Sequence, residues 1–272
     1  METIVMGLRQ VGNLGDCLYL TPAINALNES GKEVVIQMHD NAKCREVSAI
    51  FKNLARVDFV DNPTERVFML SDERTHCAQK TLNYFNINSA NCIPKIKLTE
   101  DEIAFAQKYL AKFNNPIILN NDNLGSNDPL NHCAIYRRPP EKLMQYIADY
   151  FRLMGYTVLQ FGPKQDIWES GFRTFSPLNR VVHIRDLDLR QTAACFAVIK
   201  KIITGDTGLY HLMLSVGGKA VTFHPPENKR MGYEFWGLHY TPDLWKDEKP
   251  RVKYLDYTTF NGSINEIVEF LK

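Results

Sequence analysis

The stretch ITGDTGLYHLMLSVGGKAVTFHPP, residues 203–226, decides how this chain folds, because a buried strand, a polar turn, a helix and another strand follow one another in it. Asp206, Thr207 and Gly208 stand together where the helix begins, and His211 follows in its first turn. Asp and Thr cap helices by accepting hydrogen bonds from first-turn amides. The same amides, together with the helix dipole, bind anions. Because a cap alone requires neither the glycine nor the histidine, the stretch allows both a simple cap and an anion site.

Length and composition restrict the class of protein. The chain has 272 residues, 44% hydrophobic and 23% charged, and a formal net charge of +1, so no global field favours nucleic acid or an anionic membrane. Its six cysteines show no spacing typical of a metal site, which predicts reduced thiols in an intracellular protein. No apolar stretch approaches the roughly 20 residues that span a bilayer. We therefore expect a soluble, cytoplasmic protein without an integral membrane segment.

Strand and helix patterns alternate along the chain, which predicts an α/β fold with parallel sheets built from βαβ units. Two such blocks are expected, at residues 1–95 and 114–250, with a linker at 88–98 between them. Strands are predicted at 3–8, 33–39, 57–60, 66–70, 116–121, 157–162, 181–184, 201–205 and 220–224. Helices are predicted at 16–30, 42–53, 75–85, 99–113, 139–155 and 190–199, from 206 onward, and at 264–272.

Ligands bind such sheets outside the carboxyl ends of the strands. That rule selects the loops at 9–16 and 120–138 and the turn at 205–208, which would line one cleft if the two blocks face each other. The first loop leads into GNLGDCLYLTPAINAL, residues 12–27, where two glycines allow close approach of a ligand to the backbone. Asp16 then opens a helix, either as a plain N-cap or as a general base.

These stretches resemble the family nine glycosyltransferases, whose best-known members are the bacterial lipopolysaccharide heptosyltransferases. That family carries Leu-Gly-Asp before a helix with Thr-Pro-Ala, matched here at 14–16 and 21–23. Much later it carries Asp-Thr-Gly-Leu-x-His-Leu, matched at 206–212. The segment RRPPEKLMQYIADYFRLMGYTVLQFG, residues 137–162, is similar to the family's middle part. The three segments occur in the right order, so the resemblance covers most of the chain.

The resemblance implies a GT-B fold, in which two Rossmann-like domains face a central cleft. Residues 1–98 would form a reduced acceptor domain, 99–255 the nucleotide-sugar donor domain, and 256–272 a C-terminal helix. It also implies an inverting transfer from a nucleotide-diphosphate sugar to an acceptor hydroxyl, with no metal and no cofactor. Such a transfer needs helix amides and cationic side chains for the charge left on the diphosphate.

The same resemblance assigns roles residue by residue. Asp16 matches the base that deprotonates the acceptor. Thr207 and Gly208 match the turn that holds the diphosphate, while Asp206 matches an aspartate near the donor sugar and His211 a histidine near the donor. The remaining cleft-loop candidates are Gly12, Asn13, Gly15 and Asn120.

The chain departs from the family's pattern in two places. A lysine expected before the middle segment is absent, and Arg137 or Arg138 would replace it at the donor phosphates unless the pair is simply solvated. The acceptor half is shorter than usual, so the acceptor stays open between a lipid-linked glycan, a protein and a nucleic acid. Two alternatives remain: an inactive nucleotide-sugar-binding module and a GT-B-like sugar-phosphate epimerase. A Rossmann dehydrogenase is disfavoured because no G-x-G-x-x-G follows the first strand.

Overall fold

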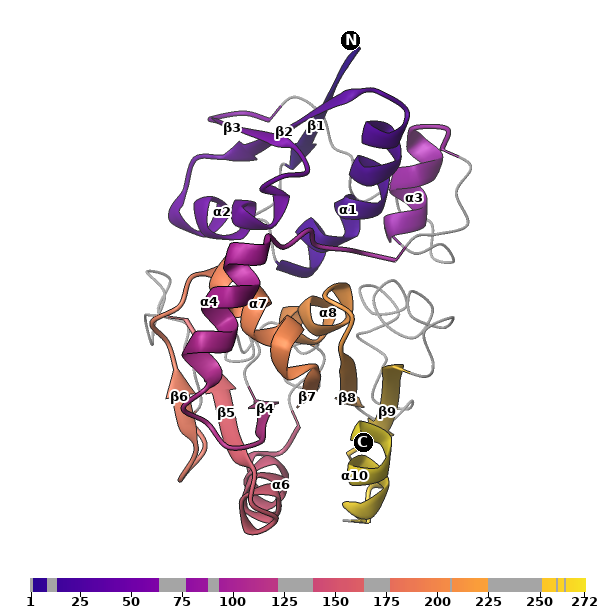
Figure 1. The fold of residues 1–272 in the computed structure, drawn as a ribbon. Coiled ribbons are helices and arrows are strands. Elements are labelled where there is room, and N and C mark those ends of the chain that lie inside the picture. Colours follow the sequence, from indigo (N-terminus) through magenta and orange to yellow (C-terminus); the bar gives the residue numbers. More distant parts are fainter. Residues whose placement is uncertain are drawn as a thin grey trace.

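The chain is described by a computed structural model, which covers residues 2–8, 14–63, 77–87, 93–121, 139–163, 177–205, 207–224, 251–257, 259–261 and 263–272. Two parallel α/β units follow one another along these ranges, and Figure 1 shows them one above the other. The first unit runs from β1 to α3 and the second from α4 to α10. The predicted α/β class with parallel sheets is confirmed.

The first unit is a three-stranded parallel sheet in the order β1-β2-β3. Its strands are β1 (Thr3–Leu8), β2 (Glu33–His39) and β3 (Arg56–Val60). Its helices are α1 (Leu14–Glu29), α2 (Ala42–Val47), the 3-10 helix η1 (Ser48–Phe51) and α3 (Cys77–Tyr84). Each of these elements matches a predicted strand or helix, whereas the strand predicted at 66–70 lies outside the described residues.

The second unit is a six-stranded parallel sheet in the order β6-β5-β4-β7-β8-β9. Its strands are β4 (Pro116–Asn120), β5 (Thr157–Phe161), β6 (Val182–Ile184), β7 (Lys201–Gly205), β8 (Lys219–His224) and β9 (Val252–Asp256). This is the doubly wound order of Rossmann sheets, in which the direction of winding reverses between β4 and β7. Strand β9 was not predicted. It is recognised by its parallel pairing with β8, and its own sequence shows no clear strand pattern.

Helices cover both faces of the six-stranded sheet. They are α4 (Glu100–Leu110), α6 (Glu141–Leu153), α7 (Leu189–Ile199), α8 (Gly208–Ser215) and α10 (Asn265–Leu271). Helices α4, α7 and α8 pack on the face turned to the first unit, and α6 and α10 on the opposite face. Thr99 and Glu102 stand three positions apart, the spacing typical of a capping box, and α4 has one: the Thr99 hydroxyl accepts from the Glu102 amide and the Glu102 carboxylate accepts from the Thr99 amide.

A single hydrophobic cluster joins the two units. It extends from the three-stranded sheet through α1 into α7, α8 and the near face of the six-stranded sheet. Apolar residues of α1 are buried in this cluster, namely Leu18, Leu20, Ile24 and Leu27. Cys17, Tyr19 and Ala23 on other sides of α1 are also buried, because α1 lies between its own sheet and α8. The units are therefore packed together at α1 and α8, and the central cleft stays a prediction.

The Thr21–Pro22 pair explains how α1 is attached to the linker. Pro22 lies inside α1 and has no N–H to donate to the carbonyl of Leu18 one turn earlier. The Thr21 hydroxyl donates to that carbonyl instead, at 2.8 Å. The same hydroxyl accepts from the Lys95 amide at 3.1 Å, so the linker is bonded to α1. One residue later, the Ile96 amide donates to the Ser215 carbonyl of α8 at 3.3 Å.

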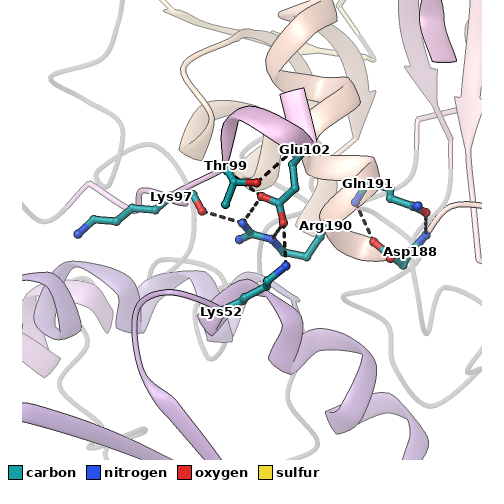
Figure 2. A network of polar contacts seen from close by, with 7 residues as sticks. All are labelled: Lys52, Lys97, Thr99, Glu102, Asp188, Arg190 and Gln191. Carbon is teal, nitrogen blue, oxygen red and sulfur yellow. Dashed lines mark hydrogen bonds and ion pairs between the residues drawn. The ribbon is translucent and has the colours of Figure 1, made fainter. Parts of the chain in front are cut away.

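A buried ion pair holds the end of the linker to the second unit (Figure 2). The Arg190 guanidinium on α7 donates Nε to Glu102 Oε1 at 2.9 Å and Nη2 to Glu102 Oε2 at 2.5 Å. Nη2 also donates to the Lys97 carbonyl at 2.7 Å. Lys52 reaches Glu102 from the first unit at 3.4 Å. Glu102 thus links the helix that opens the second unit to α7, the linker and the first unit.

Candidate functional site

The first turns of α1 and α8 lie side by side, although they belong to different sheets. A Cβ built on Gly208 would lie 3.0 Å from Leu14 Cβ and 3.3 Å from Leu14 Cγ. That is tighter than ordinary van der Waals contact, so the glycine allows the two helices to approach this closely. Thr207, Gly208 and Leu209 are partly exposed, as are Leu14 and Gly15. We call these five residues the paired helix starts.

Thr207 is the N-cap of α8. Its backbone is extended, with φ −134° and ψ 163°, and its hydroxyl accepts from the Leu209 amide at 3.3 Å. The Tyr210 amide donates to the Thr207 carbonyl at 3.2 Å. Thr207 therefore caps α8, with its hydroxyl bonded to the Leu209 amide and its carbonyl bonded to the Tyr210 amide. The cap does not exclude an anion, because the dipole of α8 still ends here.

Two helix dipoles end at the paired helix starts. Each helix N-terminus carries the equivalent of about half a positive charge, and like ends placed side by side repel each other. An anion bound at both ends, or an acidic side chain in the first turn, offsets that repulsion. Asp16 occupies the first turn of α1, two residues after the helix begins at Leu14. The arrangement is suited to a negatively charged ligand.

A buried hydrogen bond lies beneath the paired helix starts. Tyr19 Oη and His211 Nε2 are 3.1 Å apart, and their rings meet edge to face with centroids 5.3 Å apart. Tyr19 is 0% and His211 is 4% exposed. A Cβ built on Gly15 would lie 3.7 Å from His211 Cδ2 and 3.9 Å from Tyr19 Oη. The bond therefore joins α1 to α8 directly below their first turns.

Polar residues form a row across the carboxyl ends of β4, β7 and β8. Asn120 is in register with Thr204, and Thr204 with Thr222. Thr204 Oγ1 lies 3.4 Å from Thr207 Oγ1, which connects the row to the start of α8. Within the described ranges, Asn120 Oδ1 and Thr222 Oγ1 are buried without a hydrogen-bond partner. This row follows the switch point of the sheet, where doubly wound folds bind ligands.

Some of the predicted site residues lie together in the structure, and others lie outside the described ranges. It brings Gly15, Thr207, Gly208 and His211 together at the junction of α1 and α8. Asn120 was predicted in a cleft loop, but it is the last residue of β4 and is 1% exposed. The residues predicted at positions outside the described ranges are Gly12, Asn13, Arg137, Arg138 and Asp206.

Asp16 is described in its backbone only, and its side chain lies outside the described part of the chain. The interpretation of Asp16 as an N-cap is wrong, because α1 begins two residues earlier and Asp16 lies within the first turn. Its role as a base stays a prediction. The same is true of His211 as a donor contact; its Nε2 is hydrogen-bonded to the Tyr19 hydroxyl.

Sequence reasoning missed Tyr19 and Thr204. Tyr19 stands in an apolar helix sequence, where an aromatic residue indicates core packing. Its partner is 192 residues away, so no local pattern identifies the bond. Thr204 has the sequence context of an ordinary strand residue, although it is the last but one residue of a buried strand that leads into the Asp-Thr-Gly turn. That position at a strand end is the one signal from which its place in the site could have been predicted.

Two general features concern the described residues alone. No three His, Cys, Asp or Glu side chains in this part of the chain lie together as metal ligands. Metal independence nevertheless stays a prediction of the resemblance. No helix within the same ranges combines the length and apolar character that crossing a membrane requires.

Comparisons with known proteins bear on the fold. No protein-family model matches the chain, and no curated protein is detectably similar to it in sequence. A family nine glycosyl transferase from Veillonella parvula DSM 2008 superposes with a TM-score of 0.64 at 16% identity, over 100% of this chain and 90% of that one.

Two Escherichia coli structures are similar over their whole length. ADP-heptose lipopolysaccharide heptosyltransferase II gives a TM-score of 0.69 at 12% identity, covering 100% of this chain and 98% of that one. Heptosyltransferase WaaC with ADP-2-deoxy-2-fluoro heptose gives 0.57 at 11% identity, covering 99% of each chain. The chain therefore has the fold of the family nine glycosyltransferases that its motifs resemble.

Proposed function

We propose that this protein is a glycosyltransferase that moves a sugar from a nucleotide-diphosphate sugar to an acceptor hydroxyl. The observation that carries the proposal is the pair of helix starts, where two partly exposed helix N-termini from separate sheets are in direct contact. One of them bears Asp16 and the other the Thr207–Gly208 turn. The fold shared with heptosyltransferases supports it, and WaaC has been solved with ADP and with ADP-2-deoxy-2-fluoro heptose.

The proposed reaction is a single inverting displacement. Asp16 accepts the proton of the acceptor hydroxyl, and the resulting oxygen forms a bond to the anomeric carbon of the donor sugar. The bond between that carbon and the phosphate oxygen breaks, and the nucleoside diphosphate leaves with the electron pair. The central cleft of the GT-B architecture would bring donor and acceptor together at the paired helix starts.

The leaving diphosphate is the group that needs stabilisation. The Gly208 amide, which the Thr207 cap does not use, and the dipoles of both helices oppose its charge without reorganisation, because the protein holds them in place before the reaction. Arg137 or Arg138 would add a guanidinium that suits phosphate oxygens. No metal is assigned a role in this proposal. The acceptor is defined only as a hydroxyl compound.

The first experiment is a thermal-shift screen with ADP, ADP-heptose, UDP and UDP-glucose, followed by calorimetry on any ligand that raises the melting temperature. A ligand that binds the native state alone stabilises it by an amount that rises with the logarithm of its concentration over Kd. We expect at least one nucleotide sugar to bind. Binding of none would overturn the proposal.

The second experiment tests Asp16 as the base. Asp16→Asn keeps the size of the side chain and removes its basicity, so we expect donor affinity to stay within about threefold while turnover falls by about 10²- to 10⁴-fold. Turnover is followed as release of nucleoside diphosphate from the donor found in the screen, with a panel of glycan acceptors. Full turnover in the variant would show that the base assignment is wrong. Binding without turnover in the wild-type protein would favour the inactive sugar-nucleotide-binding module.

A further inference from the structure

We propose that Tyr19 is a positioning residue of the transfer site, which sets the separation between the helix of the base and the helix of the diphosphate through its bond to His211. This inference rests on the proposed function. Tyr19 lies between the matched Leu-Gly-Asp and Thr-Pro-Ala segments and belongs to neither of them. The evidence is the buried Tyr19–His211 hydrogen bond of 3.1 Å between the two units.

The spacing of residues on each helix connects this bond to the site. Tyr19 follows Asp16 by three positions and Gly15 by four, so these residues share one face of α1. On α8, His211 follows the N-cap Thr207 by four positions and lies one turn below it. The bond is therefore made one turn below both helix starts. A change in its length would change the distance between those starts.

Gly15 lies directly beside the bond, where there is room for a methyl group and for no larger side chain pointing the same way. A Cβ at this position would already touch His211 Cδ2 at 3.7 Å and Tyr19 Oη at 3.9 Å. Any longer side chain pointing the same way would enter the volume that the imidazole occupies. The glycine thus lets His211 of one unit reach into the first turn of the other, where Tyr19 meets it.

Burial makes the bond a restraint on geometry. Tyr19 and His211 are almost fully excluded from solvent, so water does not compete with the hydroxyl for Nε2. The bond also holds Nε2 and so restrains the orientation of the imidazole ring. A hydroxyl that holds both the position and the orientation of a site histidine acts through that histidine and needs no contact with substrate.

The effect on the reaction should appear mainly in kcat. Donor affinity depends on α8 and its turn, whereas transfer also depends on the distance from the base on α1 to the reacting carbon. Misplacement of a reacting group by about 1 Å costs on the order of 10²-fold in rate. Removal of the Tyr19 hydroxyl should therefore lower kcat more than it weakens donor binding.

The test is Tyr19→Phe, with Tyr109→Phe as the matched control. The Tyr109 hydroxyl on α4 donates to Asp186 at 3.0 Å, so the control removes a tyrosine hydrogen bond of similar length, at an exposed position on another helix. We expect Tyr19→Phe to lower kcat for ADP release from ADP-heptose by about 10- to 100-fold, with the Kd of ADP within about threefold. Tyr109→Phe should leave both constants unchanged. A wild-type kcat in Tyr19→Phe would overturn the inference.

Histidine substitutions provide a second test that does not depend on Tyr19→Phe folding well. His211→Gln keeps a polar group that the Tyr19 hydroxyl can bond, whereas His211→Ala does not. We expect kcat in His211→Gln to exceed that in His211→Ala by at least tenfold, and equal values would contradict the proposal.

Two further results separate this inference from the proposed function. The ¹⁵N chemical shift of His211 Nε2 should move in Tyr19→Phe and stay in place in Tyr109→Phe, and an unmoved shift in Tyr19→Phe would show that the bond is absent. If the wild-type protein binds and turns over no nucleotide sugar, the proposed function fails and this inference with it. Turnover of ADP-heptose by the wild-type protein and Tyr19→Phe alike overturns the inference alone.

Discussion

The pKa of the Glu102 carboxyl group lies well below its ordinary value. The hydrogen bond from Arg190 lowers the pKa of Glu102 from an ordinary 4.5 to about 2, with further lowering by the Thr99 amide and Lys52 and partial opposition from burial. Arg190 is only 6% exposed, so an uncharged Glu102 would leave a buried guanidinium without its counter-charge. Glu102 is therefore ionised at neutral pH.

The direction of the pKa shift predicts how stability depends on pH. Because the pKa is lower in the folded chain, ionised Glu102 stabilises the protein above about pH 4.5, and this contribution is lost as the pH falls towards 2. We expect the free energy of urea unfolding to fall less steeply across this range in Glu102→Gln than in the wild type. Equal slopes in the two proteins would show that Glu102 titrates normally.

Only part of the role of Glu102 could be predicted from the sequence. The Thr99 and Glu102 spacing identifies a capping box, which the structure confirms. The partner Arg190 lies 88 residues further along the chain, and the start of its helix predicts a surface position as readily as a buried one. The ion pair exists because α4 and α7 pack together, which no local pattern contains.

Gly208 shows at the scale of elements how one residue serves two purposes. The sequence places it in a turn where a glycine indicates a site for an anion. The structure adds that α8 meets α1 at this position, because a Cβ would lie 3.0 Å from Leu14 Cβ. Gly15 is the corresponding glycine on α1, and it has ordinary space around it. The two glycines therefore form a matched pair for mutation.

Alanine at these two positions should have different effects. In Gly208→Ala the new methyl group forces α8 away from α1, so we expect a loss of about 1–3 kcal/mol in the free energy of unfolding. In Gly15→Ala the methyl group fits at 3.7 Å from His211, so we expect a change below about 1 kcal/mol. Chemical denaturation measures both. A Gly208→Ala variant at least as stable as Gly15→Ala would mean that the helices separate without cost.

At the scale of the whole molecule, the two sheets are joined by one continuous apolar cluster. Residues of α1, α7 and α8 contribute to it, and both sheets reach it from opposite sides. The linker adds bonds to α1 and α8, and Glu102 bonds to Lys52 of the first unit. Breaking the units apart would expose apolar surface on both, which is costly in water.

This continuity predicts a single unfolding transition. We expect far-ultraviolet circular dichroism and the near-ultraviolet signal of buried aromatic residues such as Tyr19 and Tyr210 to report coincident urea transitions, because neither unit is stable once the shared cluster is exposed. A control is Leu18→Ala, a buried change on α1 that should lower the midpoint of both signals together. Two separate transitions would show that the sheets fold independently.

By itself the sequence determined the order of the described strands and helices apart from β9, the capping box and the two motifs, because period, caps and turn residues act over a few positions. Tertiary structure alone decided the pairing of β9, the burial of α1 on all sides, the Glu102–Arg190 pair and the Tyr19–His211 bond. Each of these joins residues that lie far apart along the chain. Their energy comes from desolvation and close packing between elements, which depend on how the two sheets are brought together and leave no local pattern in the sequence.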